Sequence, residues 1–183
     1  MKKVKRGLFV GRFQPIHKGH VKAVITLMEK VDELIIIIGS ARKSHDLTNP
    51  FTIGERVWMV RSALDEAQVD PSQHLILPVP DAIMHSVWVS QIISYSPPFD
   101  VVFSNEPLTR RLFKEKNITV ENVRFFQRKI YSSTEVRRRM LIGENWEELL
   151  PKVVVKIIGV IDGINRIREL AKSDSPFGSK KGV

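Results

Sequence analysis

The chain alternates short, uniformly apolar runs with longer segments whose apolar residues recur every three or four positions. Uniformly apolar runs are typical of strands buried on both faces of a parallel sheet, and the longer period is typical of amphipathic helices. The strongest strand signal is the run Leu34-Ile35-Ile36-Ile37-Ile38. In all, five strands are predicted, over residues 7–11, 34–39, 74–79, 100–104 and 122–127.

Helices are predicted between and after these strands. Thr52 and Glu55 have the spacing of a capping box, which predicts a helix that continues to about Ala67. Near the end of the chain, apolar residues recur at helical steps from Val153 to Ile167, which predicts one last helix with Pro151 in its first turn. Further helices are predicted over residues 18–30, 85–95 and 108–116, and from a second capping-box spacing at 132–135.

Strands that alternate with helices form βαβ units, whose right-handed crossovers place helices on both faces of a mostly parallel sheet. We therefore expect an α/β fold: a Rossmann-like, doubly wound, five-stranded sheet followed by a C-terminal helical segment. Ligands of such folds bind outside the carboxyl ends of the strands. Residues 1–172 are expected to form a single domain, and the Ser-, Pro-, Gly- and Lys-rich residues 173–183 a flexible tail.

Composition narrows the class of protein without identifying its function. Lysine and arginine number 29 against 20 aspartates and glutamates, and the net charge of +9 favours anionic ligands such as nucleotides or nucleic acid. The basic residues between Arg124 and Arg139 would also suit a solvated helix face. With no cysteine, the chain has neither disulfides nor thiolate metal sites. No signal peptide or membrane-spanning apolar stretch is recognisable, so a cytoplasmic location is expected.

The segment after the first predicted strand carries the clearest chemistry. It reads Gly11-Arg12-Phe13-Gln14-Pro15-Ile16-His17-Lys18-Gly19-His20 and opens a helix, where free N–H groups and the helix dipole attract phosphate. His17 and His20 share one helix face, and Gly19 leaves room for a ligand near the backbone. Together with Arg12 they would stabilise charge that develops on a phosphoryl group. A metal site or a polar surface is the alternative, although the remaining histidines lack metal-ligand spacing.

A second helix start has a similar character. Its sequence, Tyr131-Ser132-Ser133-Thr134-Glu135-Val136-Arg137, gathers hydroxyl groups and free N–H groups, with an arginine one turn later. Such a start forms an anion cradle suited to the outer phosphates of a nucleotide. The alternative is a well-capped helix without any ligand.

The two motifs together resemble the signatures of the nucleotidyltransferase superfamily, H-x-G-H followed late in the chain by S-S-T-x-x-R. Its members transfer AMP or CMP from a nucleoside triphosphate to a phosphate or an alcohol. Finer matches are similar to the archaeal-type nicotinamide-nucleotide adenylyltransferases, and the resemblance extends to about residue 171. These matches are G-R-F-Q-P-x-H-x-G-H at 11–20, G-S-A at 39–41, N-P-F-T-x-G-E-R at 49–56 and T-E-V-R-R-R-M at 134–140.

The resemblance implies an ATP site built from both motifs. His17 and His20 would contact the phosphates and steady the transition state. Arg12 would grip phosphate, and Arg137 would hold the outer phosphates, so these four residues are the expected catalytic groups. The complete set expected at the ATP site is Gly11, Arg12, Phe13, Gln14, His17, His20, Ser132, Ser133, Thr134 and Arg137.

The resemblance also implies an acceptor site for nicotinamide mononucleotide. Trp88 would stack on the pyridinium ring, a cation–π contact worth ~0.5–2 kcal/mol, while Asp81 would suit the positive ring or its ribose. Plain core packing is the alternative for Trp88. His85 stands where the archaeal pattern has Asn, so its role stays open. The expected acceptor residues are Gly39, Ser40, Asp81, His85, Trp88 and Asn105.

The implied reaction is in-line attack of the acceptor 5′-phosphate on the α-phosphorus of ATP, which forms NAD and pyrophosphate. Mg²⁺ would enter with ATP, without a metal site in the protein itself. One alternative is a nucleotidyltransferase with another acceptor, of the pantetheine-phosphate, FAD-forming or glycerol-phosphate type. The other is a basic nucleic-acid-binding module, for which the sequence offers no recognised motif. We expect no nucleic-acid or membrane partner, and the resemblance suggests a homo-oligomer such as a hexamer.

Overall fold

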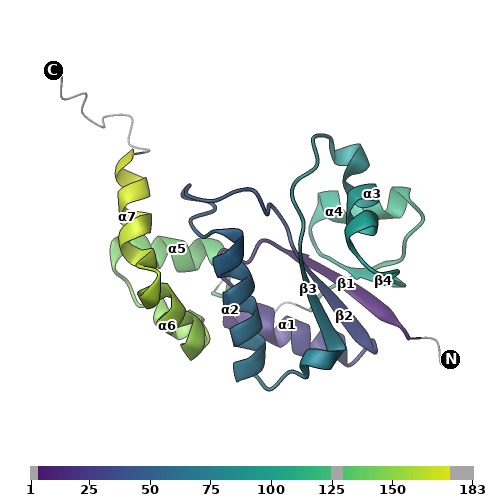
Figure 1. Ribbon diagram of the computed structural model, residues 1–183, viewed down its shortest axis with the longest axis horizontal. Coiled ribbons are helices and arrows are strands. Elements are labelled where there is room, and N and C mark those ends of the chain that lie inside the picture. Colours follow the sequence, from purple (N-terminus) through teal and green to yellow (C-terminus); the bar gives the residue numbers. More distant parts are fainter. Residues whose placement is uncertain (1–3, 125–129, 174–183) are drawn as a thin grey trace.

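The computed structural model describes residues 4–124 and 130–173, in which five strands form one parallel sheet (Figure 1). The strands are β1 (Arg6–Gly11), β2 (Glu33–Ile38), β3 (His74–Pro78), β4 (Val101–Phe103) and β5 (Val120–Glu121). Their order across the sheet is β3-β2-β1-β4-β5. The chain runs outward from β1 to β3 and then returns to the other side of β1, so its direction reverses beside β1. Ligand crevices form at such a reversal, outside the carboxyl ends of the strands.

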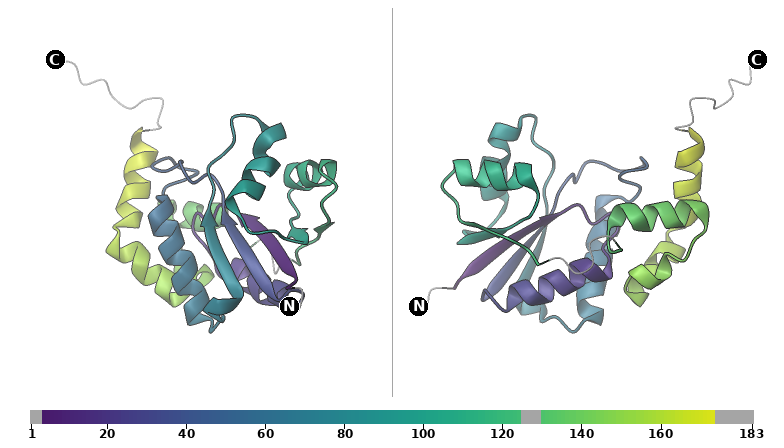
Figure 2. Two further views of the ribbon diagram at one scale, coloured as in Figure 1. Left: turned by 45° about the vertical axis from the view of Figure 1, so that its right-hand side comes forward. Right: turned by 180° about the vertical axis from the view of Figure 1, so that it is seen from behind.

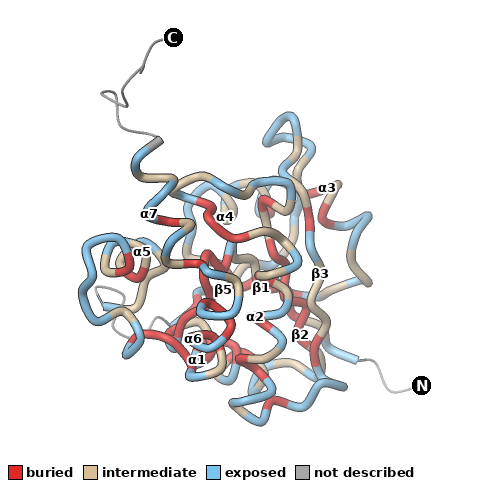
Figure 3. Tube along the Cα trace, turned by 60° about the vertical axis from the view of Figure 1, so that its left-hand side comes forward, coloured by how far each residue is buried: buried red, intermediate tan, exposed pale blue. Residues whose placement is uncertain are grey.

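Helices cover both faces of this sheet (Figure 2), as the alternating pattern predicts. Side chains alternate along each strand, so Leu8 of β1 packs with α3 and α4 while the next residue, Phe9, packs with α1 and α2. The buried residues concentrate along the central strands and the helix faces turned toward them (Figure 3). The helices are α1 (Lys18–Met28), α2 (Ile53–Glu66), α3 (His85–Tyr95), α4 (Pro107–Glu115), α5 (Ser133–Ile142), α6 (Lys152–Val160) and α7 (Gly163–Ser173), with short 3-10 turns η1 (Pro71–Gln73) and η2 (Glu147–Leu149).

Both predicted capping boxes start a helix, but only the first is complete. The Thr52 hydroxyl accepts from the Glu55 N–H, and the Glu55 carboxylate accepts from the Thr52 N–H. At α5 the Ser132 hydroxyl accepts from the Glu135 N–H, whereas the Glu135 carboxylate binds Arg138 and Arg139. The second expectation was therefore half wrong, because two arginines one turn later compete for the carboxylate.

The fifth strand lies earlier than predicted. β5 covers only Val120–Glu121, and residues 122–124 are not part of a strand. Residues 125–127 of the predicted strand lie outside the described part. The Asn105 side chain explains this end, since its amide donates to the Val123 carbonyl and accepts from the Val123 N–H. A side chain thereby satisfies the main-chain groups that a longer strand would have bonded.

The last helix is two helices. α6 ends at Val160 and α7 begins at Gly163, and between them Asp162 adopts a left-handed φ of 52°. The apolar period runs on through the break because both helices bury the same kind of face, so the sequence pattern alone does not reveal it. Pro151 is the residue before α6 rather than part of its first turn. Ser173, assigned to the tail, still belongs to α7, and none of the described helices is long and apolar enough to cross a membrane.

Candidate active site

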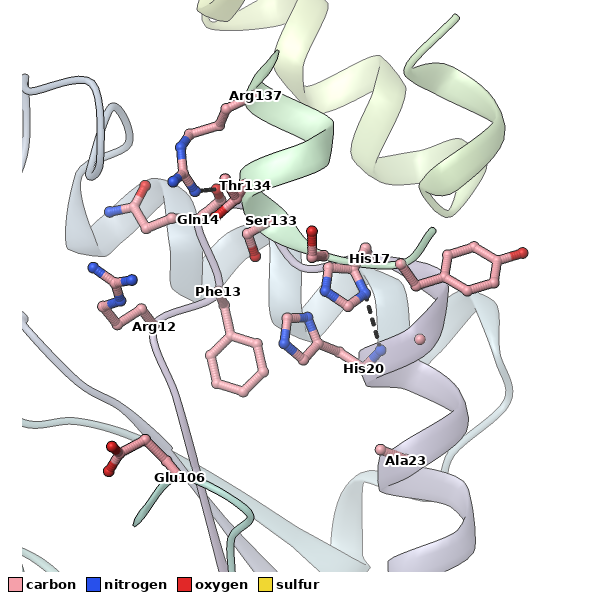
Figure 4. A pocket seen from close by; sticks show the side chains of 13 residues that line it. Arg12, Phe13, Gln14, His17, His20, Ala23, Glu106, Ser133, Thr134 and Arg137 are labelled. Atoms are coloured by element: carbon pink, nitrogen blue, oxygen red, sulfur yellow. Dashed lines mark hydrogen bonds between the residues drawn. The ribbon is translucent and has the colours of Figure 1, made fainter. Parts of the chain in front are cut away.

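A cavity of about 320 Å³ opens where the loop after β1 meets the start of α5 (Figure 4). It brings together the two predicted phosphate-binding motifs, which lie more than a hundred positions apart in the chain. Of the residues expected at the ATP site, only Gly11 lies outside its lining, in the neighbouring cavity. The lining residues from the two motifs are Arg12, Phe13, Gln14, His17, His20, Ser132, Ser133, Thr134 and Arg137.

Direct hydrogen bonds hold the two motifs together. The Ser133 hydroxyl donates to the Pro15 carbonyl at 2.9 Å, and the Arg137 guanidinium donates to the Gln14 carbonyl at 2.8 Å. The first turn of α5 and the first turn of α1 therefore face one cavity, where their free N–H groups and dipoles add. Burial, and then the charge of Arg12, lower the pKa of Arg137 to about 10, so it remains a cation at neutral pH.

The two histidines form a stacked pair. Their ring centroids lie 3.6 Å apart at an angle of 21°, and His17 Nδ1 accepts from the main-chain N–H of His20 at 3.2 Å. Burial lowers the pKa of His17 to about 4; burial and then the proximity of His17 lower the pKa of His20 well below its ordinary value. Both rings are thus neutral near pH 7. Since Nδ1 of His17 accepts, its proton resides on Nε2 and can be donated to a ligand.

Gly19 permits the close approach of α1 to α5. A Cβ atom at this position would lie 2.8 Å from Tyr131 Cβ and 3.1 Å from His17 Nδ1. Real Cβ atoms do not come that close to another carbon, so any larger residue would push the histidine pair away from the start of α5. The glycine of the H-x-G-H motif therefore serves packing between the two helices.

The side chains of Phe13 and Gln14 pack against other parts of the protein beside the site. The Gln14 amide donates to the Phe51 carbonyl and accepts from the Phe51 N–H, at 2.9 and 3.0 Å, so it is engaged within the protein. Phe13 is buried with its ring 4.9 Å from that of His20. Gly11 leaves space for this ring, since a Cβ there would lie 2.7 Å from it. The expected contact of Gln14 with ATP stays a prediction, and its side-chain amide is already bonded to Phe51.

A second cavity, of about 660 Å³, adjoins the first and shares Arg12 and Glu106 with it. Five of the expected acceptor residues line it: Gly39, Ser40, Asp81, His85 and Trp88. Asn105 does not line it. Its amide pairs with the backbone of Val123, and the residue lines a separate surface pocket. The structure thus places Asn105 apart from the other five expected acceptor residues, and its contact with the acceptor stays a prediction.

The polar groups of the second cavity are already partly organised. Asp81 accepts from the Ser40 hydroxyl at 3.0 Å and pairs with Lys43 at 3.0 Å. Burial alone would raise the pKa of Asp81, but the hydrogen bonds from Lys43 and Ser40 outweigh it and lower the pKa. Trp88 is half-buried and packs edge-on against Phe113 with 5.7 Å between ring centroids. It thus has both a structural contact and a place on the cavity wall.

Several lining residues were not assigned to either substrate by the sequence analysis, among them Lys43, Glu106 and Tyr131. Glu106 had a readable signal, because it precedes a proline and caps α4 by accepting from the N–H groups of Leu108 and Thr109. Lys43 lies in an irregular loop that gives no periodic signal. The other arginines of α5, Arg138 and Arg139, pair with Glu135, Glu144 and Glu148 rather than with the cavity.

The histidine pair should make stability depend on pH. A histidine that is neutral when folded and protonated when unfolded costs stability as the pH falls from about 6.5 toward 4. We expect the free energy of unfolding to decrease over this interval, by up to about 1.4 kcal/mol per pH unit for each histidine. Denaturant titrations at several pH values should show that the free energy of unfolding of His17→Asn depends less steeply on pH. The exposed His45→Asn should match the unaltered protein. Equal slopes in all three would contradict the burial of a neutral His17.

Gly19→Ala tests the contact between the two helix starts. In an ordinary helix this change stabilises by up to about 1 kcal/mol, but here the clash should destabilise by about 1–3 kcal/mol and weaken ATP binding. Gly54→Ala is the matched control, because nothing lies within 4 Å of the position its Cβ would take. Unfolding titrations and calorimetric binding of ATP measure both effects. If the two variants behaved alike, the close approach at Gly19 would be of no consequence.

Comparison with known proteins agrees with this geometry. The family model described as cytidylyltransferase-like matches residues 8–139. The nicotinamide-nucleotide adenylyltransferase of Methanolobus tindarius is 47% identical over 95% of this chain and 99% of its own length. That of Pyrococcus horikoshii is 51% identical over 91% of this chain and 89% of its own.

A solved structure shares the fold. The bifunctional NMN adenylyltransferase/ADP ribose pyrophosphatase of Francisella tularensis, complexed with AMP and a manganese ion, superposes with a TM-score of 0.75 at 22% identity. The match covers 94% of this chain and 53% of that one. By its family match and by its similarity to these relatives over nearly its whole length, the chain belongs to the cytidylyltransferase-like family, among the archaeal nicotinamide-nucleotide adenylyltransferases.

Proposed function

We propose that the protein transfers AMP from ATP to nicotinamide mononucleotide, forming NAD and pyrophosphate. The observation that carries the proposal is the convergence of two helix starts, the histidine pair and Arg137 on one cavity that adjoins a second through Arg12. A triphosphate suits the first cavity, which is rich in N–H donors. A mononucleotide with a flat, positive ring suits the second, which is lined by Trp88 and Asp81.

The chemistry requires positioning more than proton transfer. An oxygen of the acceptor 5′-phosphate attacks the α-phosphorus of ATP, and the bond from that phosphorus to the bridging oxygen breaks as pyrophosphate leaves. The attacking phosphate is already ionised at neutral pH, so no general base is needed. Neutral His17 and His20 would donate N–H groups to the oxygens of the α-phosphate, and Arg12 would bind where the two phosphates meet.

The outer phosphates would bind at the start of α5. The Ser132 hydroxyl already caps the helix and the Ser133 hydroxyl already donates to Pro15. The free main-chain N–H groups of this turn and the Arg137 guanidinium are therefore the main donors for the leaving pyrophosphate. Placing donors at the leaving group favours the bond cleavage itself.

Mg²⁺ is the expected divalent ion, and it would neutralise charge on the triphosphate. Among residues 4–124 and 130–173, no cluster of three or more His, Asp or Glu side chains could hold a metal ion. Phosphate oxygens and water would therefore provide its ligands, which is the usual way in which Mg²⁺ enters such sites. Of the described residues, Glu106 is the acidic residue that lines both cavities.

The direct test is to mix the purified protein with Mg-ATP and nicotinamide mononucleotide and to measure NAD and pyrophosphate. Parallel reactions with pantetheine phosphate, FMN and glycerol 3-phosphate examine the alternative acceptors. Pyrophosphate release only with one of those compounds would replace the proposed acceptor. Salt-dependent RNA binding without any pyrophosphate release would favour the nucleic-acid-binding alternative. A homo-oligomer and a cytoplasmic location remain predictions for sizing and cell fractionation.

His20→Ala should lower turnover by about two to three orders of magnitude, the usual cost of losing one preorganised donor to a developing charge. The Michaelis constants for both substrates should change much less. Steady-state kinetics measure both quantities. His45→Ala is the control, because His45 is exposed and lines neither cavity. Turnover equal to that of the control would remove His20 from the mechanism.

Trp88→Ala should raise the Michaelis constant for nicotinamide mononucleotide by about tenfold and leave that for ATP nearly unchanged. The reason is loss of a ring contact worth ~0.5–2 kcal/mol. Trp58→Ala serves as the control, since Trp58 lies exposed on α2 away from both cavities. A rise for ATP of the same size would mean that Trp88 belongs to the other subsite or only to the core.

A further inference from the structure

Arg56 is an arginine with no exposed surface, located in the first turn of α2. Its guanidinium donates to four main-chain carbonyl oxygens, those of Arg12 at 3.0 Å, Gly39 at 2.8 Å, Ser40 at 2.9 Å and, at the longest distance, Lys43 at 3.5 Å. Arg12 directly follows β1, while Gly39 and Ser40 directly follow β2. One buried side chain therefore joins the carboxyl ends of two neighbouring central strands.

The joined segments serve different subsites. Arg12 lines both cavities, whereas Gly39 and Ser40 line only the second. Ser40 adopts a left-handed φ of 51°, and its hydroxyl donates to Asp81. By holding the Ser40 carbonyl, Arg56 restrains the main chain that carries this hydroxyl. The side chain thus links main-chain groups beside the first cavity to those beside the second.

The surroundings of Arg56 are unusual for a buried charge. In the described part of the chain, no carboxylate forms an ion pair with it, and main-chain carbonyl dipoles take that place. A buried cation whose hydrogen-bond acceptors are all neutral costs stability, and such costs are typical of functional sites. Packing alone would be served as well by an apolar side chain.

We propose that Arg56 is a positioning residue that sets the distance and orientation of the two bound phosphates relative to each other. This inference rests on the function proposed above. Arg56 itself lines neither cavity, so its loss should change the binding of either substrate alone less than it changes the rate. In-line attack requires both phosphates in register, and a misplacement of about 1 Å costs about a hundredfold in rate. The loss of Arg56 therefore falls on turnover.

Two substitutions separate geometry from charge. Arg56→Lys keeps the charge, but a single ammonium group does not reproduce the fork that reaches several carbonyls at once. Arg56→Met removes both charge and hydrogen bonds. We expect turnover to fall about a hundredfold in each, with Michaelis constants for ATP and nicotinamide mononucleotide changed by less than about threefold. Wild-type turnover in Arg56→Lys, or a loss carried entirely by one Michaelis constant, would overturn the proposal.

Arg166→Lys is the matched control. Arg166 of α7 binds Glu55, the neighbour of Arg56 in α2, at 2.7 and 2.8 Å, yet it lines neither cavity. Its substitution should lower the melting temperature through the same helix without changing turnover. An equal loss of turnover in Arg166→Lys would reduce the role of Arg56 to general stability of α2.

If the Arg56 variants do not fold, a measurement on the unaltered protein tests the proposed link between the two cavities. ATP alone should slow amide hydrogen exchange in residues 12–20, and through Arg56 also in the acceptor-side residues 39–43. Protection confined to residues 12–20 would overturn the proposed link. This readout needs only ATP binding, so it is independent of the acceptor. Protection of both segments in a protein that forms no NAD would refute the proposed reaction and still support the link.

Discussion

The site depends on the contact between the start of α5 and the loop that joins β1 to α1. Two hydrogen bonds, Ser133 to Pro15 and Arg137 to Gln14, span 118 and 123 positions of the sequence. Each helix start alone would be an ordinary anion site of the kind found in many folds. Held side by side, with Gly19 at their close approach, they line one cavity of about 320 Å³. The chemistry therefore arises from a tertiary contact and not from either motif by itself.

The same contact determines the electrostatic character of the histidines. Packing of Tyr131 and the α5 start over α1 buries the stacked rings, and burial lowers the pKa of both. Two cations stacked 3.6 Å apart would repel each other, so neutrality also stabilises the pair. Positive charge is supplied instead by Arg12 and Arg137. In the proposed mechanism the arginines would attract the polyanion, and the imidazoles would provide directed N–H donors that need no rearrangement during reaction.

The sequence predicted those features that local pattern controls. The uniformly apolar β2, the complete capping box at Thr52 and both anion-binding helix starts follow from short-range rules. The end of β5 did not follow, because the side chain of Asn105 replaces the main-chain partner of Val123. The break before α7 was hidden by an apolar period that continues across it. Arg56 and Lys43 were not predicted as site residues, since their contacts depend on which strands lie side by side, and strand order is not written in any local pattern.

The arrangement also explains how one chemistry can serve different acceptors. The histidine pair and the start of α5 pack on the face of the sheet that carries α1 and α2, whereas Trp88 and His85 belong to α3, on the opposite face. The two halves meet at the strand ends, where Arg12 and Glu106 line both cavities. A substitution in α3 or α4 can therefore reshape the acceptor cavity without moving the groups that bind the triphosphate. The departure from the archaeal pattern at His85 lies in that wall of the second cavity, so we expect it to bear on the choice of acceptor rather than on the binding of the triphosphate.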